Sequence, residues 1–234
     1  MLFRSIDISL HLGSLIAIIY FFRDELFDAR KNKRLLSLII LGSIPLVIVG
    51  YILYNTNLIY QLRNIETIAW TTLIFAIILF ISDKNRFDKK ISSNLNFQSI
   101  IFIGVFQIFS LVPGVSRAGI TITAARILKF NRVDSSKISF LLSIPALAGA
   151  SVLSLKDVFE QSIQFNYLVV IAIISSFIFS FLTVKFFLIY INKFSMNAFV
   201  IYRIIIALIL FSLDRKSTRL NSSHSQQSRM PSSA

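Results

Sequence analysis

Long apolar runs constrain this chain more than any other feature of its sequence. Six of them reach or approach the roughly 17–25 residues that an α-helix needs to cross a bilayer. The chain has 234 residues, of which 55% are hydrophobic and only 15% are charged, too few for the surface of a soluble domain of this size. We therefore predict an all-α polytopic membrane protein with a single membrane domain, residues 1–213. The predicted spans cover residues 6–22, 35–53, 65–81, 138–155, 167–191 and 198–213.

The basic residues lie in the loops between these runs. The net charge of +13 invites a nucleic-acid partner, but Lys and Arg in short loops act as orientation signals, so we expect no nucleic acid. Residues 23–34 carry five Lys or Arg and residues 82–90 carry four, whereas residues 55–64 carry one. The two basic loops are therefore predicted to face the cytoplasm. The chain has no cysteine, which excludes a disulfide framework and fits a bacterial inner membrane.

Residues 99–130 do not fit a single membrane span. They contain two apolar stretches, 99–112 and 120–130, and each is too short to cross alone. The following residues, 128–137, are basic again, so they belong on the same side as residues 82–90. One crossing would put them on opposite sides. We therefore predict that residues 99–130 form a re-entrant helix hairpin, which needs protein or a polar cavity around its irregular backbone.

The two ends of the chain lead to two further expectations. Re-entrant hairpins often occur in pairs related by an inverted repeat. Three spans follow the predicted hairpin, and three spans precede it with no hairpin ahead of them, so we expect a second hairpin that is missing from the N-terminus. At the other end, residues 214–234 are Ser-rich and polar and resemble translated vector sequence. We expect this tail to be disordered and non-native.

The sequence "SLVPGVSRAGITIT", Ser110 to Thr123, lies at the predicted hairpin turn. Pro113 lacks a backbone donor and Gly114 adopts conformations closed to other residues, so together they end the first half-helix. The second half-helix then begins with unpaired amides at the positive end of its dipole, which makes an anion site. The amides expected to converge there belong to Val115, Ser116, Arg117 and Ala118.

Polar side chains in the same stretch support a site for phosphate or diphosphate. Ser116 and Thr121 add hydroxyl groups, and the planar guanidinium of Arg117 suits phosphate oxygens. An arginine at membrane depth is costly and indicates function. The alternative is that Arg117 extends to the membrane surface from an ordinary turn. Gln107, on the first half-helix, either lines the pocket or forms a hydrogen bond to a neighbouring helix.

The residues "QIFSLVPGVSRAGITIT" resemble the second signature, P-G-x-S-R-S-x-x-T, of the undecaprenyl-diphosphate phosphatase (bacitracin-resistance) family. Ala118 departs from the signature, which puts one hydroxyl contact in doubt. The segments "LHLGSLIAIIYFFRDEL", "FLLSIPALAGA" and "FVIYRIIIALILF" are also similar to spans of this family, so the resemblance covers about residues 3–213. The matching residues are Pro113, Gly114, Ser116, Arg117 and Thr121.

The resemblance implies a hydrolase that removes the terminal phosphate of undecaprenyl diphosphate and recycles the lipid carrier of cell-wall synthesis. Its partners would be the polyprenyl diphosphate and the membrane, and a homodimer is left open. The implied catalytic residues are Arg117, Ser116 as nucleophile or hydrogen-bond donor, and Thr121. The implied substrate-binding residues are Gly114, Val115, Ala118 and Gln107.

The family's first signature, an E-x-x-x-E hairpin followed by P-x-S-S-T-G-H, has no match in this chain. The resemblance implies a divalent cation, Mg²⁺ or Ca²⁺, held by those acids, and none of its ligands can be assigned here. No base for a nucleophilic Ser116 is visible either. We therefore expect this chain to hydrolyse its substrate poorly.

Three other functions compete with this hypothesis. A transporter or flippase of an anionic lipid or small anion fits the hairpin equally well. A lipid phosphatase of the acid-phosphatase type needs a histidine at the position of Thr123, which speaks against it. A structural subunit gives Arg117 no purpose. For Arg203, early in the last span, a structural role near the headgroups is the preferred interpretation over catalysis.

Overall fold

The computed structural model describes residues 2–27, 29–56, 62–85, 87–159 and 167–227, and these residues form helices and their connections without a β-strand. Apolar, lipid-facing helices satisfy all their backbone groups internally, as a membrane requires. Four helices are long and apolar enough to cross a membrane, within residues 32–56, 65–83, 167–193 and 197–214. The helices are α1 (Leu2–Phe21), α2 (Arg23–Phe27), α3 (Ala29–Thr56), α5 (Ile65–Asp83), α6 (Ile91–Asn94), α7 (Phe97–Gln107), α8 (Arg117–Ile127), α9 (Arg132–Phe159), α10 (Tyr167–Lys193) and α11 (Asn197–Gln227).

All six predicted spans coincide with helices, most of which extend beyond the predicted limits, although α1 ends one residue before its predicted limit. The C-terminal end of the chain differs more from its prediction. The tail from residue 214 is predicted to be disordered, but α11 continues to Gln227. Adding residues to an existing helix avoids the costly nucleation step, so a polar sequence can continue it without a packing partner. Residues 228–234 of the tail lie outside the described residues.

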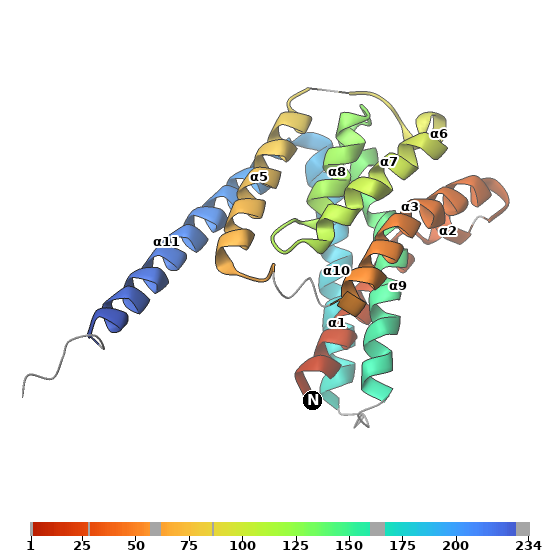
Figure 1. The fold of residues 1–234 in the computed structure, drawn as a ribbon. Coiled ribbons are helices and arrows are strands. Elements are labelled where there is room, and N and C mark those ends of the chain that lie inside the picture. Colours follow the sequence, from red (N-terminus) through yellow and green to blue (C-terminus); the bar gives the residue numbers. More distant parts are fainter. Residues whose placement is uncertain (1, 28, 57–61, 86, 160–166, 228–234) are drawn as a thin grey trace, which may run out of the picture.

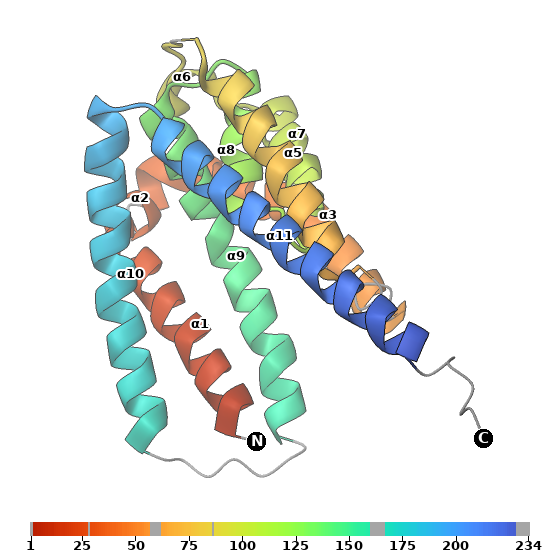
Figure 2. The ribbon, with the colours of Figure 1, turned by 90° about the vertical axis from the view of Figure 1, so that its left-hand side faces the viewer.

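Two groups of helices build the molecule. Helices α1, α9 and α10 pack side by side, and α5 packs along α11 (Figure 2). Small residues bring α1 close to α10: the Ser14 hydroxyl lies 3.0 Å from that of Ser176 and 2.9 Å from that of Ser180. A Cβ on Gly13 would lie 2.4 Å from the carbonyl oxygen of Ile173. Such close contact between small residues is the usual way in which membrane helices associate.

Between these groups lies a hairpin of two short helices (Figure 1). Helix α7 begins at the cap residue Asn96, continues as the 3₁₀ turn η1 (Ile108–Leu111), and the chain then reverses into α8. The segments that flank the hairpin meet again, because the Asn131 amide donates to the Lys89 carbonyl over 3.0 Å. The hairpin packs deeply: a Cβ on Gly104 of α7 would lie 2.2 Å from the carbonyl oxygen of Gly42 in α3.

A buried cluster of charges, which we call the charged junction, fixes the ends of the hairpin. It consists of Asp83, Arg126 and Arg132. The Arg132 Nε donates to both Asp83 carboxylate oxygens, over 2.8 and 3.1 Å. The Arg126 Nε lies 3.1 Å from Asp83 Oδ1, as an ion pair without hydrogen-bond alignment. Asp83 also accepts from the Met196 amide, so the junction joins the end of α5, the end of α8, the start of α9 and the α10–α11 turn.

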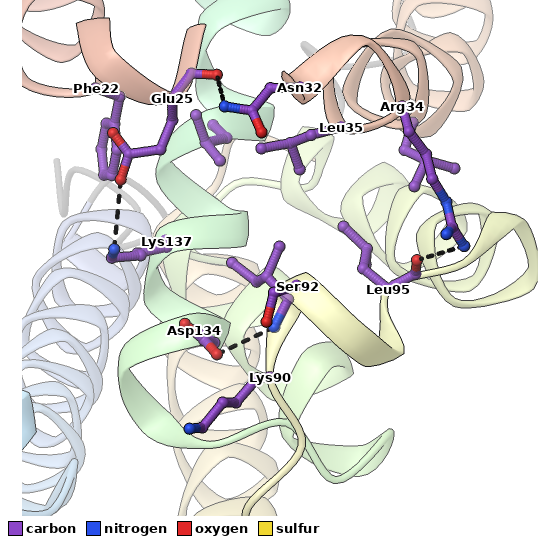
Figure 3. Close-up of a pocket in the computed structure, with 13 residues that line it drawn as sticks. Phe22, Glu25, Asn32, Arg34, Leu35, Lys90, Ser92, Leu95, Asp134 and Lys137 are labelled. Carbon is purple, nitrogen blue, oxygen red and sulfur yellow. Dashed lines mark hydrogen bonds and ion pairs between the residues drawn. The ribbon is translucent and has the colours of Figure 1, made fainter. Parts of the chain in front are cut away.

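A pocket of about 390 Å³ with both apolar and charged lining residues lies at the same end of the molecule (Figure 3). Across it, Lys137 pairs with Glu25 over 3.4 Å, and Asn32 donates to the Glu25 carbonyl over 3.1 Å. Lys90 and Asp134 also line this pocket. The structure thus gathers the basic loops 23–34, 82–90 and 128–137 at one end, as their charge predicts.

Candidate functional site

The chain reverses between α7 and α8 at Pro113 and Gly114. Gly114 has φ +88°, a left-handed conformation that glycine adopts without strain. Space also requires glycine, since a Cβ there would lie 2.1 Å from the Thr71 hydroxyl oxygen and 2.7 Å from the Ile68 carbonyl oxygen. The predicted break is therefore confirmed at these two residues, and its tight backbone fits closely against α5.

Hydroxyl groups on α5 hold the carbonyls of the turn. Thr71 donates to the Pro113 carbonyl over 2.7 Å, and Thr72 donates to the Gly114 carbonyl over 3.2 Å. The peptide bonds are trans, so the Gly114 N–H points to the side opposite the Pro113 carbonyl, away from Thr71. Sequence reasoning missed both threonines; their spacing on a span carries no signal by itself.

Ser116 caps α8. Its Oγ accepts from the Gly119 amide over 3.2 Å, and its backbone is extended, as at most N-caps. Arg117 and Ala118 then occupy the first two helical positions, where an amide has no acceptor within the helix. Val115 is different: its amide donates to the Val112 carbonyl over 3.2 Å and its side chain is buried. The prediction of four free amides is therefore wrong for Val115, because the 3₁₀-like turn uses that donor.

The side chains of Ser116 and Ala118 are exposed at the hairpin turn, and that of Arg117 is partly exposed. Within the described residues, no carboxylate pairs with Arg117. The ion pairs there instead involve Asp24, Glu25 and Asp83. The start of α8 thus presents two free amides, a hydroxyl and a guanidinium without an acidic partner, which is a site for an oxyanion.

Thr121 lies one turn further along α8, in the protein interior. Its hydroxyl contacts the carbonyls of Arg117 over 2.9 Å and Ala118 over 3.2 Å, and lies 2.7 Å from the Ser139 hydroxyl of α9. The structure therefore places Thr121 behind the first turn of α8, between that helix and α9. Its hydroxyl can support the backbone of Arg117.

Gln107 is fully buried at the end of α7, and neither atom of its amide has a hydrogen-bond partner within the described residues. The hydrogen bond to a neighbouring helix, one of the two sequence interpretations, is thus not formed there. A buried amide without partners costs about 1–3 kcal/mol. Gln107 is therefore an unused polar group two turns from the hairpin break.

Arg203 of α11 reaches the same turn. Its Nη2 donates to the Gly114 carbonyl over 3.0 Å and lies 3.5 Å from the Thr72 carbonyl, and its side chain is buried. The sequence interpretation was a structural role near the headgroups; the structure shows that α11 crosses α5 and brings the guanidinium of Arg203 to the hairpin turn. The signal that could have found it is the arginine itself, at membrane depth without a nearby acid.

A metal site requires several acidic or imidazole ligands in one place. No group of three or more His, Cys, Asp or Glu residues that could hold a metal ion occurs in the part of the chain that the structure describes. The residues of the hairpin turn do not fit a divalent cation either, since they are donors and a cation rather than acceptors.

Comparisons with known proteins agree with the sequence signature. A family model described as bacitracin resistance protein BacA matches residues 2–209. An undecaprenyl-diphosphatase of Pelagibacter ubique (strain HTCC1062) is 67% identical over 207 residues, which cover 88% of this chain and 81% of the relative. An undecaprenyl-diphosphatase of Elusimicrobium minutum (strain Pei191) is 40% identical over 213 residues, 87% of this chain and 81% of the relative. One of Alcanivorax borkumensis is 36% identical over 220 residues, with 87% and 82% covered.

Proposed function

The chain belongs to the bacitracin resistance protein BacA family, and on this premise we propose that it hydrolyses undecaprenyl diphosphate to undecaprenyl phosphate and inorganic phosphate. The observation that carries the proposal is the start of α8, where Arg117 and two free amides meet without an acidic partner. Diphosphate hydrolysis needs such a site, because charge builds on the phosphoryl oxygens as the bond to the leaving phosphate breaks.

We assign to Arg117 the binding of the transferring phosphoryl group, through the paired N–H donors of its guanidinium. Ser116 fits the role of donor better than that of nucleophile. Its oxygen already accepts from the Gly119 amide, which leaves its proton free to bind an anion, and no base contacts it among the described residues. Thr121 is best assigned as a positioning residue, since its hydroxyl contacts the Arg117 carbonyl. Gly114, Ala118 and Gln107 complete the proposed substrate-binding set. Val115 is left out of it, because its amide donates to the Val112 carbonyl and its side chain is buried.

For the membrane topology we propose six spans, with the α7–α8 hairpin entering from the cytoplasmic side of a bacterial inner membrane and returning to it. Two observations support this arrangement. The basic loops lie at one end of the molecule, and the segments before and after the hairpin meet at Lys89 and Asn131. By helix rise, the turn at Thr71 lies about 18 Å along α5 from Asp83, well within the thickness of a bilayer.

The chain has no native cysteine, so single-cysteine labelling can test this topology directly. We expect Lys90→Cys and Lys137→Cys to react with an impermeant maleimide from the cytoplasmic side. Leu62→Cys, ahead of α5, should react only from the other side. Labelling of Lys90→Cys and Lys137→Cys from opposite sides would exclude the re-entrant hairpin.

The divalent cation stays an expectation from the family. Because the described residues offer no ligand cluster, we assign no step to it. Hydrolysis itself is tested by phosphate release from radiolabelled undecaprenyl diphosphate in detergent micelles, with the Pelagibacter protein as positive control. The expected result is slow release, in line with the poor hydrolysis expected from the sequence, and Arg117→Gln should reduce it further. Movement of the intact lipid across vesicle membranes without release would favour the flippase instead.

A further inference from the structure

Arg203 is a buried cation whose hydrogen-bonding capacity is mostly unused. The residue is 9% exposed, and among the described residues only its Nη2 has partners, the carbonyls of Gly114 and Thr72. The Nε is buried and has no hydrogen-bond partner within the described residues. A guanidinium carries five N–H donors, so most of them remain available for another group.

This charge has no acidic partner in the described part of the chain. None of the ion pairs among the described residues includes Arg203. Burial of a charge without a counter-ion costs several kcal/mol, and two carbonyl dipoles offset only part of that cost. A buried cation of this kind is expected to be compensated by an anion that binds from outside.

The geometry of α8 indicates where the anion would lie. Arg203 Nη1 is 3.2 Å from the position that a Cβ on Gly119 would occupy, and Ser116 Oγ is 3.4 Å from that same position. The guanidinium therefore approaches the first turn of α8 because Gly119 has no side chain. Ser116 and Arg203 both lie around this one small space, and Arg117 belongs to the same first turn of α8.

We propose that Arg203 is the second cation of the diphosphate site. On the basis of the proposed function, its free N–H groups bind oxygens of one phosphoryl group of the lipid diphosphate, beside Ser116 and Gly119. Arg117 binds the other phosphoryl group. Two separate guanidinium groups match a diphosphate, with its two charged phosphoryl groups, better than a monophosphate. Arg203 is therefore a residue that determines the preference for diphosphate.

The test is binding of a C15 polyprenyl diphosphate and of the matching monophosphate to the purified chain in detergent, measured by calorimetry. Arg203→Gln should weaken diphosphate binding on the order of 30-fold and monophosphate binding much less, as for a lost hydrogen bond to a charged group. Arg203→Lys keeps the charge and should lie between Arg203→Gln and wild type. The matched control is Arg132→Gln, which removes an arginine of the charged junction and should leave both affinities unchanged.

The outcomes separate this inference from the proposed function. Failure of the wild-type chain to bind the diphosphate would contradict both the proposed function and the role of Arg203. Binding by the wild type together with equal affinity of Arg203→Gln would overturn the role of Arg203 alone. The same holds if Arg203→Gln loses affinity for both lipids in equal proportion and unfolds at a lower temperature than wild type, because that result indicates a structural role.

A second variant tests whether the space beside Gly119 holds a phosphoryl group. Gly119→Ala places a methyl group against Arg203 Nη1 and Ser116 Oγ and should weaken diphosphate binding about 5- to 10-fold without unfolding the protein. Gly149→Ala is its control, because a Cβ there meets no atom within 4 Å. Unchanged affinity in Gly119→Ala would contradict a bound phosphoryl group at this position.

Discussion

The two ends of the hairpin use arginine in opposite ways. At the charged junction, Arg126 and Arg132 both contact Asp83, and Arg126 also donates to the carbonyls of Phe130 and Asn85. At the turn, Arg117 and Arg203 have no carboxylate partner within the described residues. Both ends therefore hold arginines that are at least partly buried, but among the described residues only the junction supplies a carboxylate to balance them.

This difference indicates what each end is for. A buried cation with a fixed carboxylate is a complete structural unit, and its free energy is already part of the folded state. A buried or half-buried cation without one is stable only at a cost, which a bound anion repays. We therefore assign the junction to holding the hairpin in place, and the turn to the proposed binding of the ligand.

The largest effect that can test this difference between the two ends is expected when the charge of Arg117 at the turn is removed. Arg117→Gln is expected to reduce phosphate release by about 10²–10³-fold, since it removes the donors that face the developing charge. The midpoint of thermal unfolding should stay close to that of wild type, because no partner of Arg117 is left unpaired. Phosphate release and circular dichroism on the same preparation measure both. A large loss of stability with intact turnover would assign Arg117 to the structure.

The second variant removes the acid of the charged junction instead of the cation of the turn. Asp83→Asn leaves Arg126 and Arg132 without their counter-charge, so we expect the free energy of unfolding to fall by about 3 kcal/mol or more. Affinity for polyprenyl diphosphate in the protein that remains folded should change little. Unfolding in a denaturing detergent measures the loss, with the exposed Asp88→Asn as the control. A stability equal to wild type would mean that the junction does not anchor the hairpin.

The sequence was sufficient for much of this architecture because membrane helices follow simple rules. Apolar length predicted a helix at each of six positions, and loop charge predicted that residues 99–130 turn back, since both depend on composition rather than on packing. Among the described residues, four helices are long and apolar enough to cross a membrane. The break at Pro113–Gly114 and the cap at Ser116 depend on local backbone chemistry, so they were predictable too. Arg117 was singled out because an arginine within a predicted membrane segment is rare, and its role stays a prediction.

The contacts between helices could not be predicted in the same way. The donation of Thr71 and Thr72 to the turn, and the approach of Arg203 to Gly114, depend on how α5 and α11 cross. The prediction of a free amide at Val115 was wrong for a related reason. A 3₁₀-like turn, rather than an open loop, precedes α8 and uses that donor. These features require the distances between segments that are far apart in sequence.

The backbone of the turn offers a finer test of the comparison. Gly114→Ala forces a side chain into a left-handed conformation and against Thr71 and Ile68, at a cost of about 2 kcal/mol. Because the turn also forms the ligand site, diphosphate affinity should fall together with stability, unlike at the junction. Gly50→Ala is the control, since its Cβ would meet only Leu111 at 3.7 Å. Unfolding and calorimetry on both variants decide whether the two quantities are coupled.

The smallest expected effect concerns the hydroxyl that holds the Pro113 carbonyl. Thr71→Val keeps the shape of the side chain but removes the donor, so the free energy of unfolding should fall by about 1 kcal/mol. Thr71→Ser retains the hydroxyl and should stay within a few tenths of a kcal/mol of wild type on this measure. If the turn is held as rigidly as its contacts indicate, Thr71→Val should also loosen the first turn of α8. Hydrogen exchange at Ile120, whose amide donates to the Ser116 carbonyl over 2.9 Å, would detect this. Exchange that is faster at the junction than at the turn would reverse the comparison, because the fixed end would then be the mobile one.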